Sequence, residues 1–452
     1  MSTTNLLVIS DLHLADNRNA LEGFHLRQQM ALEGLLQAAL PGGSLEIPSE
    51  LTLIINGDCF DFLAVEPYPP DGLSTPQISL EKLEQIAAAH EPFFSALRTF
   101  LDQGGRVIFL IGNHDIELCF AAVRARVAQL IDPTHTRRAS LHFCLDQHFQ
   151  PLPDVWIEHG NQYDLWNATS ELWDEHGKAL NPEPEQIQLP WGTQYMQRVS
   201  LPISLDYPYF ERFDPALGMT RQIALLSLLN PALVVETARK VAGMMTNGHQ
   251  PLRDLPPGDE HVPARLFAHA MSDFAAFLQD IQARVDTWSA MESRLYSPIE
   301  LMQRQAETLS TFFTLSMALE EGQDQALQAI LAPPSDAGDE DTARGMQNVL
   351  RTHPDLRVAI AGHTHITRRE QSLTHEQLYL NTATWTQRLQ PPTFDTLTNV
   401  TLDWLRASDL ACSPLVDKTS HVFAWISAQP GQPSTARLCT WEGGRNGAYR
   451  VL

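Results

Sequence analysis

Cysteine is scarce in this sequence and does not form the pattern of a disulfide framework. Five cysteines occur among 452 residues, an odd number, and none of them forms a Cys-x-x-Cys pair. Domains that depend on disulfides are usually short and rich in paired cysteines, so a reducing compartment is favoured. We expect Cys59, which follows Asp58, to be a small packed side chain rather than a metal ligand.

Basic residues are also few. The chain has 31 Lys and Arg against 54 Asp and Glu, which gives a formal net charge of -23. Because so acidic a surface repels a phosphate backbone, we expect no duplex nucleic acid as a partner. A small phosphorylated substrate is not excluded, since bound cations can supply local positive charge.

Long apolar runs are missing as well. None reaches the roughly 18 residues that a membrane span needs, and no secretory leader is visible. The first expected strand, Leu6–Ser10, carries Asp11, so removal of an ordinary leader would destroy that motif. A cytoplasmic protein without a transmembrane segment is therefore expected. Residues 219–245 are apolar but interrupted at Pro231; core packing is favoured for them, with peripheral lipid contact as the alternative.

Strand and helix patterns alternate in the first part of the chain. Continuous apolar runs predict strands, and longer segments bounded by Gly or Pro predict helices. The expected strands are 6–10, 51–56, 106–111 and 155–158, the expected helices are 23–40 and 79–102, and the expected loop is 67–76. This alternation is typical of parallel strands in an α/β architecture.

The pattern becomes helical across residues 166–350. Segments 219–245 and 299–331 are predicted to be helices, and 267–288 carries apolar residues at alternating steps of four and three. This seam is typical of an intramolecular bundle; a dimerisation coiled coil is the alternative, and the oligomeric state stays open. Residues 333–341 are expected to be an acidic flexible linker.

Residues suited to metal binding follow five of the expected strands. They are Asp11 and His13 in ISDLHL, Asp58 and Asp61 in NGDCFDF, Asn113 and His114 in IGNHD, His159 in IEHGN, and His363 and His365 in AGHTH. Side chains at the carboxyl ends of strands are well placed to form a common site. The five motifs together therefore predict more than any one of them does alone.

The residue types predict a site for two cations. Asp and His are the expected ligands of borderline divalent metals such as Mn, Fe, Co or Zn. A carboxylate has two oxygens, so Asp58 can bridge two metals, and Asn113 offers a neutral oxygen that limits the anionic charge. Two metals about 3.5–4 Å apart can clamp a phosphate and ionise a shared water.

Strand patterns return after the helical region. They lie at 356–361, 378–381, 400–404, 421–426 and 436–441, and the last four are expected to be antiparallel. Because His363 and His365 follow the first of these strands, the motifs on either side of the helical region must fold together. We therefore predict one discontinuous domain, 1–165 with 351–452, interrupted by a helical cap insertion at 166–350.

The set DLH, GDxxD, GNHD, HG and GHTH resembles the calcineurin-like metallophosphoesterase superfamily, over about 5–165 and 351–390. The resemblance implies a four-layer α/β/β/α sandwich whose motif-bearing domain is catalytic. It implies a bridging Asp58, with the other ligands divided into one set of Asp11, His13 and His365 and a second set of Asn113, His159 and His363. It also implies that His114 protonates the leaving oxygen and that Asp61 orients His114.

Within this superfamily, SDLHL, GDCFDF and AGHTH are similar to the UDP-2,3-diacylglucosamine pyrophosphatases of lipid A synthesis. The LNTATW run that ends at Trp385 is similar as well. Two departures stand out: those enzymes usually carry Arg where this chain has His114, and their insertion is much shorter. The expected activity is hydrolysis of phosphate esters or anhydrides, with a phosphodiesterase or pyrophosphatase acting on a small or lipid-linked substrate favoured. The choice between monoester, diester and pyrophosphate stays open.

Two alternative functions stay open at this level. One is a nuclease on the same scaffold, which would need a local basic strip. The other is a non-catalytic metal-binding scaffold that binds partners through the helical insertion. Asp164 and Tyr163, close to His159, are either supports of the ligands or ordinary residues. Arg368 and Arg369 are either exposed charges or phosphate-binding groups.

Overall fold

The computed structural model describes residues 3–18, 24–45, 47, 51–69, 71–164, 167–169, 172–174, 176–213, 219–230, 233, 314–315, 318, 323–331, 337–372, 376–396, 403–406 and 414–452. The chain forms two compact units. Unit 1 consists of Met1–Gln194, Asp336–Gln387 and Thr419–Leu452, and unit 2 of Tyr195–Ser335 and Arg388–Lys418. All five motifs that are predicted to bind metal belong to unit 1.

The larger sheet of unit 1 has seven strands in the order β14-β13-β12-β1-β2-β4-β5. Their bounds are β1 Thr4–Ile9, β2 Leu51–Asn56, β4 Arg106–Leu110, β5 Leu141–Phe143, β12 His421–Ala428, β13 Thr435–Glu442 and β14 Ala448–Val451. Strands β1, β2, β4 and β5 are parallel, as expected for strands joined through helices. Strands β12, β13 and β14 extend the sheet in antiparallel pairs.

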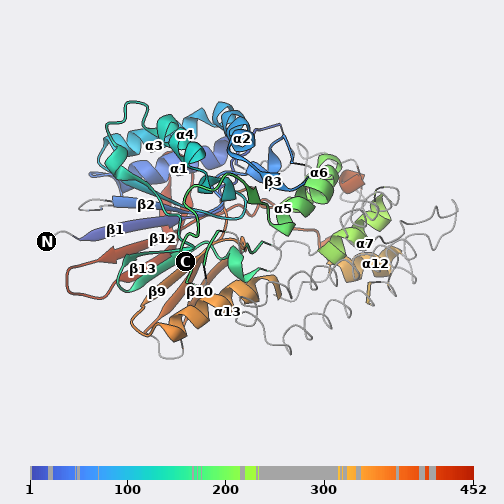
Figure 1. The fold of residues 1–452 in the computed structure, drawn as a ribbon. Helices are drawn as coiled ribbons and strands as arrows, with labels where there is room; N and C mark the ends of the chain where they lie inside the picture. The colour runs from blue at the N-terminus through green and yellow to red at the C-terminus, as the bar shows by residue number, and fades with distance from the viewer. Residues whose placement is uncertain are drawn as a thin grey trace. The chain divides into compact units, whose positions relative to one another are not determined.

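Four helices cover one face of this sheet (Figure 1): α1 Leu26–Ala39, α2 Pro76–Ala89, α3 Glu91–Asp102 and α4 Ala121–Ile131. Strand residues such as Leu53, Ile55 and Phe109 are buried against these helices. Because successive side chains of a strand point to opposite faces, the intervening Ile54 and Ile108 belong to the other face of the sheet.

That other face packs against a second sheet, of five strands in the order β10-β11-β9-β7-β6. Their bounds are β6 His148–Leu152, β7 Val155–Glu158, β9 Val358–Ala361, β10 Thr367–Gln371 and β11 Leu378–Thr382. Helix α13, Ala337–Thr352, packs through Met346 and Leu350 against its remaining face. The predicted α/β class is confirmed, whereas the four-layer arrangement stays a prediction.

Helices α2 and α3 correct the prediction of one helix at 79–102. Helix α2 ends before His90, and α3 begins after it. Pro92, in the first turn of α3, has no backbone N–H to continue a helical ladder, so the chain stops and starts again. The predicted loop at 67–76 contains β3 Leu73–Ser74, which pairs with β8 Ile187–Gln188.

Two further predictions are wrong. The linker predicted at 333–341 overlaps α13, which begins at Ala337 and presents an apolar stripe to the sheet in its later turns. Residues 403–406 are helical where a strand was predicted at 400–404. Trp404 and Leu405, the two central residues of that helical turn, are both buried. In a half-exposed strand, neighbouring side chains point to opposite faces, so only one of the two would be buried.

Unit 2 is mainly helical where the structure describes it, and isolated bridges join Leu389 to Phe213 and to Asp417. Its helices include α6 Leu201–Asp206, α7 Met219–Leu229 and α12 Gln323–Leu331, and α5 Trp191–Tyr195 precedes them. Helix α7 buries three consecutive residues that begin at Ala224, which favours core packing for this part of 219–245. The predicted seam at 267–288 lies outside the described residues, as does most of 299–331. Among the described residues, no helix has the length and apolarity to cross a membrane.

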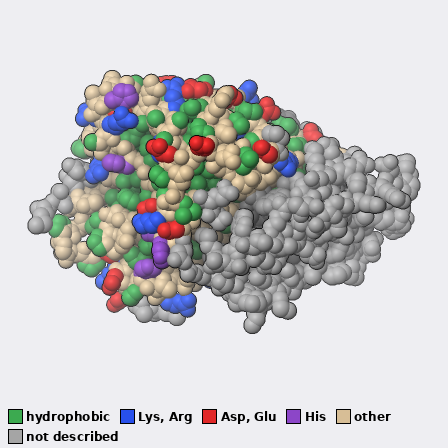
Figure 2. All heavy atoms as spheres, in the orientation of Figure 1, with side chains coloured by type: hydrophobic (Ala, Val, Ile, Leu, Met, Phe, Trp, Pro, Cys, Tyr) green, Lys and Arg blue, Asp and Glu red, His purple; other side chains and the backbone are tan. Residues whose placement is uncertain are grey.

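Charged side chains are dispersed over the face of the molecule drawn in Figure 2. Lys and Arg side chains there lie among acidic and apolar ones, and the described residues on that face form no continuous basic area. This distribution follows from the acidic composition, with 54 acids against 31 bases.

Candidate metal site

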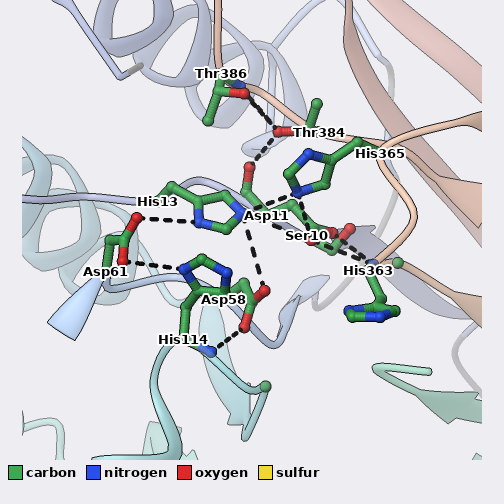
Figure 3. Close-up of polar contacts among 12 residues, drawn as sticks. Ser10, Asp11, His13, Asp58, Asp61, His114, His363, His365, Thr384 and Thr386 are labelled. Carbon is green, nitrogen blue, oxygen red and sulfur yellow. Dashed lines mark hydrogen bonds and ion pairs between the residues drawn. The ribbon is translucent and has the colours of Figure 1, made fainter. Parts of the chain in front are cut away.

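Five loops meet at one edge of the two sheets, and each carries predicted ligands; Figure 3 labels residues of the loops after β1, β2, β4 and β9. Asp11 and His13 follow β1, Asp58 follows β2, Asn113 and His114 follow β4, His159 follows β7, and His363 and His365 follow β9. Because β1, β2 and β4 are parallel neighbours, their carboxyl ends share an edge. Asn56 joins the two sheets there: its side-chain amide donates to the Glu158 carbonyl and its own carbonyl accepts from His159 Nδ1, each at 2.8 Å.

The backbone at these ligands adopts a conformation that side chains usually avoid. The φ angles of 55°, 50°, 51°, 69° and 60° belong to Asp11, His13, Asp58, His363 and His365. These are five of the eight non-glycine residues with positive φ in the described part of the chain. Left-handed backbone costs of order 1–3 kcal/mol per residue and persists where the surroundings enforce it, commonly at functional sites. The loops therefore present these side chains at a cost in stability.

Two glycines let the loops approach the carboxylates closely. A Cβ at Gly112 would lie 2.1 Å from Asp58 Oδ1, and one at Gly362 would lie 2.5 Å from Asp11 Oδ2. Both distances are well inside van der Waals contact, so any side chain at either position would displace a predicted ligand. The glycines of IGNHD and AGHTH are thus required by the geometry of the site.

Asp11, His13 and His365 form the first cluster, named here the His13 group. Their ligand atoms lie within 4.8 Å of one another. His365 Nε2 is 3.0 Å from His13 Nε2 and 3.3 Å from Asp11 Oδ1. A distant segment supports the group, because Thr384 Oγ1 and the Trp385 N–H donate to the Asp11 carbonyl at 2.8 and 3.1 Å.

Asp58, His159 and His363 form the second cluster, named here the His159 group. Asp58 Oδ2 lies 3.1 Å from His159 Nε2 and 3.8 Å from His13 Nε2, and Asp58 Oδ1 accepts the His114 N–H at 2.8 Å. Asp58 thus lies between the His159 group and His13. It also forms a third possible metal-binding set with His13 and His114.

Asp61 lies between two imidazoles (Figure 3). Its Oδ1 is 3.0 Å from His114 Nδ1, and its Oδ2 is 3.4 Å from His13 Nδ1. Because a carboxylate only accepts hydrogen bonds, it favours the tautomers that carry the proton on Nδ1 and leaves each Nε2 for another partner. The contact with His114 was expected from the sequence, and the contact with His13 was not.

Two buried ligand atoms have no hydrogen-bond partner among the described residues, and they test whether the residues suit a cation. They are Asn113 Oδ1 and His159 Nε2. Because His159 Nδ1 must donate to the Asn56 carbonyl, its Nε2 presents a lone pair to the Asp58 carboxylate 3.1 Å away. Two facing acceptors repel unless a cation or a proton lies between them. The residues therefore fit a divalent metal of the borderline class.

Burial and charge oppose each other in the site. Burial would lower the pKa of His159, but the adjacent Asp58 carboxylate outweighs it and raises that pKa to about 9. Burial opposes ionisation of Asp58 too, yet the charge of His159 lowers the pKa of that carboxyl. Burial would also lower the pKa of His13, which Asp11 and Asp61 raise well above its usual value. Positive charge, as protons or as a metal, is thus required to hold the acids together.

The side chains of the site differ in their exposure to solvent. The side chains of Asp11, Asp58 and His159 are at most 2% exposed, whereas those of His114 and His365 are 19% and 26% exposed. Of these five side chains, His114 and His365 are thus the ones that contact solvent most.

Asp115, the last residue of the IGNHD motif, supports the site and had no predicted role. It is fully buried, and its carboxylate accepts the backbone N–H groups of Gly112 and Cys59 at 2.7 and 2.8 Å. Burial, and next the charge of Asp58, raise the pKa of this carboxyl to about 7. An acid directly after two predicted site residues was the only signal in the sequence.

Of the residues that the sequence left open, Asp164 contacts a predicted ligand. Its Oδ2 is 3.2 Å from His363 Nε2. Tyr163 instead forms a hydrogen bond with the buried Glu158 side chain. Arg368 forms an ion pair within its own strand, β10. Asp164 thus contacts a predicted ligand, whereas Tyr163 and Arg368 contact other residues.

No protein-family model and no curated protein matches this chain. Among solved structures, the chain is similar to a mutant of a cold-active protein tyrosine phosphatase, with 10% sequence identity, a TM-score of 0.26, and coverage of 99% of this chain and 80% of that chain. A TM-score this low shows no common fold, so the likeness carries no argument. The chain itself shows a mixed α/β architecture with buried His and Asp groups that could hold metal ions.

Proposed function

We propose that the protein hydrolyses phosphate esters or anhydrides with the help of two divalent cations. The observation that carries the proposal is the convergence of the His13 group and the His159 group around Asp58, whose carboxylate lies 3.1 Å from His159 Nε2. Paired cations in such a site are suited to phosphoryl chemistry. The motif resemblance to the calcineurin-like metallophosphoesterases points in the same direction.

The ligands would divide into two sets that share one carboxylate. One set is Asp11, His13, Asp58 and His365, and the other is Asp58, Asn113, His159 and His363. Asp58 is the proposed bridge because its Oδ2 is within 3.1 Å of His159 Nε2 and 3.8 Å of His13 Nε2. When bound, cations such as Mn, Fe, Co or Zn would neutralise phosphate oxygens and acidify the attacking water.

His114 and Asp61 would handle the proton of the leaving group. Asp61 accepts from His114 Nδ1 at 3.0 Å, and this bond holds the ring so that Nε2 is directed to the ligand cluster. A proton on that Nε2 would pass to the leaving oxygen of the substrate. Such general-acid assistance is typically worth roughly 10²–10⁴-fold in rate.

The proposed architecture is a four-layer α/β/β/α sandwich, supported by two packed sheets with helices against the outer face of each. The catalytic domain would comprise 1–165 and 351–452, and 166–350 would be a helical cap that selects the substrate. We propose a small or lipid-linked phosphodiester or pyrophosphate as that substrate. The net charge of -23 disfavours duplex nucleic acid.

The test is hydrolysis of a chromogenic phosphodiester in the presence of Mn²⁺. Removal of a residue that only orients the ligands costs roughly 10–100-fold. Asp58→Asn should lower turnover by more than that, because a ligand itself is changed. The matched control is Asp132→Asn, because this buried carboxylate also accepts backbone N–H groups, those of Thr136 and Arg137, within its own loop. Undiminished turnover by metal-loaded Asp58→Asn would refute the proposal.

A further inference from the structure

Asp115 accepts four backbone N–H groups from the loops that carry Asp58 and His114. Oδ1 accepts from Gly112 at 2.7 Å and Asp58 at 3.2 Å, and Oδ2 accepts from Cys59 at 2.8 Å and Phe60 at 3.4 Å. A carboxylate offers about four lone-pair sites, so none remains for a cation. In agreement, Asp115 belongs to none of the three possible metal-binding sets among the described residues.

The shape of the loop after β2 makes this arrangement possible. Three consecutive N–H groups converge on one anion because Asp58 adopts a left-handed φ of 51°, as in the backbone concavities that bind anions. That conformation is strained for a residue with a side chain. The buried Asp115 carboxylate supplies the anion that stabilises it.

The same carboxylate reaches the second loop. It holds Gly112, two residues before His114, whose own N–H donates to Asp58 Oδ1 at 2.8 Å. Each loop is therefore bound to Asp115 and to the other loop. A shift of Asp115 would move the Asp58 carboxylate and His114 together.

We infer that Asp115 is a positioning residue of the metal site, which fixes the Asp58 carboxylate between the His13 group and the His159 group. The inference rests on the proposed function and deepens it. Asp115 acts through Asp58 and touches neither a cation nor the substrate. In Asp115→Asn, the side-chain NH₂ would face N–H groups that it cannot accept, so two of the four bonds would be lost.

The experiment measures Mn²⁺ binding by titration calorimetry to the wild type, Asp115→Asn and the control Asp132→Asn. Asp115→Asn should bind Mn²⁺ about 10–100-fold more weakly, the range for residues that orient ligands, and Asp132→Asn should bind as the wild type does. Thermal unfolding of the metal-free proteins shows that each variant is folded. A purely structural role would lower the unfolding temperature of Asp115→Asn and leave its Mn²⁺ affinity unchanged.

A second variant covers the case in which Asp115→Asn does not fold. Asp115→Ser leaves room for formate, which should occupy the place of the carboxylate and restore Mn²⁺ affinity, whereas neutral formamide should not. If both variants fail to fold while Asp132→Asn folds, Asp115 serves the fold rather than the site, and the inference is overturned. Wild-type affinity in Asp115→Asn would overturn it too and leave the proposed function intact. No Mn²⁺ binding by the wild type would overturn both.

Discussion

The His13 group and the His159 group are neighbours that satisfy their polar atoms differently. In the His13 group, the rings contact an acid and each other: His13 Nδ1 lies 3.4 Å from Asp61 Oδ2, and His365 Nε2 lies 3.0 Å from His13 Nε2. In the second group, His159 Nε2 faces a carboxylate, and the nearby Asn113 Oδ1 has no hydrogen-bond partner among the described residues. His159 Nε2 and Asn113 Oδ1 are therefore left for a cation, whereas His13 Nε2 and His365 Nε2 already contact each other. We expect the tighter metal site at the His159 group.

The largest expected effect separates the two groups. His159→Ala should lower the Mn²⁺ affinity of the tighter site by more than about 100-fold, because a ligand is lost and not only its support. His365→Ala should leave the tighter site intact and weaken only the other one. Titration calorimetry on both variants measures the two affinities. If His159→Ala and His365→Ala lowered the Mn²⁺ affinity of the tighter site equally, the proposed difference between the groups would be wrong.

The ligands of both groups were predictable because each follows a strand with a clear apolar run. Strands β1, β2, β4, β7 and β9 were all expected from the sequence, two of them with the observed bounds. The supports of the ligands were not predictable. Asn56 joins two sheets through His159, and Thr384 bonds to the carbonyl of Asp11 across a sequence separation of 373. No local pattern marks such contacts.

Apart from the short pair β3 and β8, the strands that escaped prediction share a position in the fold. β5, β6, β10 and β14 are the edge strands of the two larger sheets. They are short and polar: β10 reads TRREQ and has no buried residue, and β6 contains Pro151. An edge strand is defined by pairing with its neighbour, whereas a central strand is recognised by its own apolar residues.

A pH titration tests the proton of the His159 group next. The pKa of His159, which burial would lower and Asp58 raises, is about 9, so at pH 7 the metal-free ring carries a proton. That proton must leave before Nε2 can bind a cation. Mn²⁺ affinity of the tighter site should therefore rise with pH, by about tenfold per unit below pH 9 for one released proton. Calorimetry at several pH values checks this, and pH-independent binding would contradict it.

A smaller difference in turnover is expected between variants of Asp61 and Asp164, the two acids that contact the imidazole rings of the site. Asp61 contacts His13 and His114 and its side chain is 7% exposed, whereas Asp164 contacts His363 and is 31% exposed. We expect Asp61→Asn to lower turnover by about 10–100-fold and Asp164→Asn by about tenfold or less. Steady-state hydrolysis of a chromogenic phosphodiester measures both. A greater loss in Asp164→Asn would reverse the proposed order.

The smallest expected effect concerns the backbone of the His13 group. Thr384→Val removes the hydroxyl that donates to the Asp11 carbonyl and that also bonds to the backbone N–H and the hydroxyl of Thr386, while the Trp385 N–H still donates to Asp11. One such bond is worth about 0.5–1.5 kcal/mol, so the variant should lose at least that much unfolding free energy, measured by denaturant titration. The control is Thr386→Val, because the Thr386 hydroxyl bonds to Thr384 and not to Asp11. Equal losses of unfolding free energy in the two variants would mean that the bond to the Asp11 carbonyl adds nothing to stability.

The bridging position of Asp58 is tested most directly by electron paramagnetic resonance of the protein loaded with Mn²⁺. Two Mn²⁺ ions per chain, with the exchange coupling of ions that share a ligand, are expected for the wild type. Asp58→Asn should lose the coupled signal, and Asp132→Asn should keep it. A wild type that binds a single Mn²⁺, or two ions without coupling, would contradict a shared Asp58.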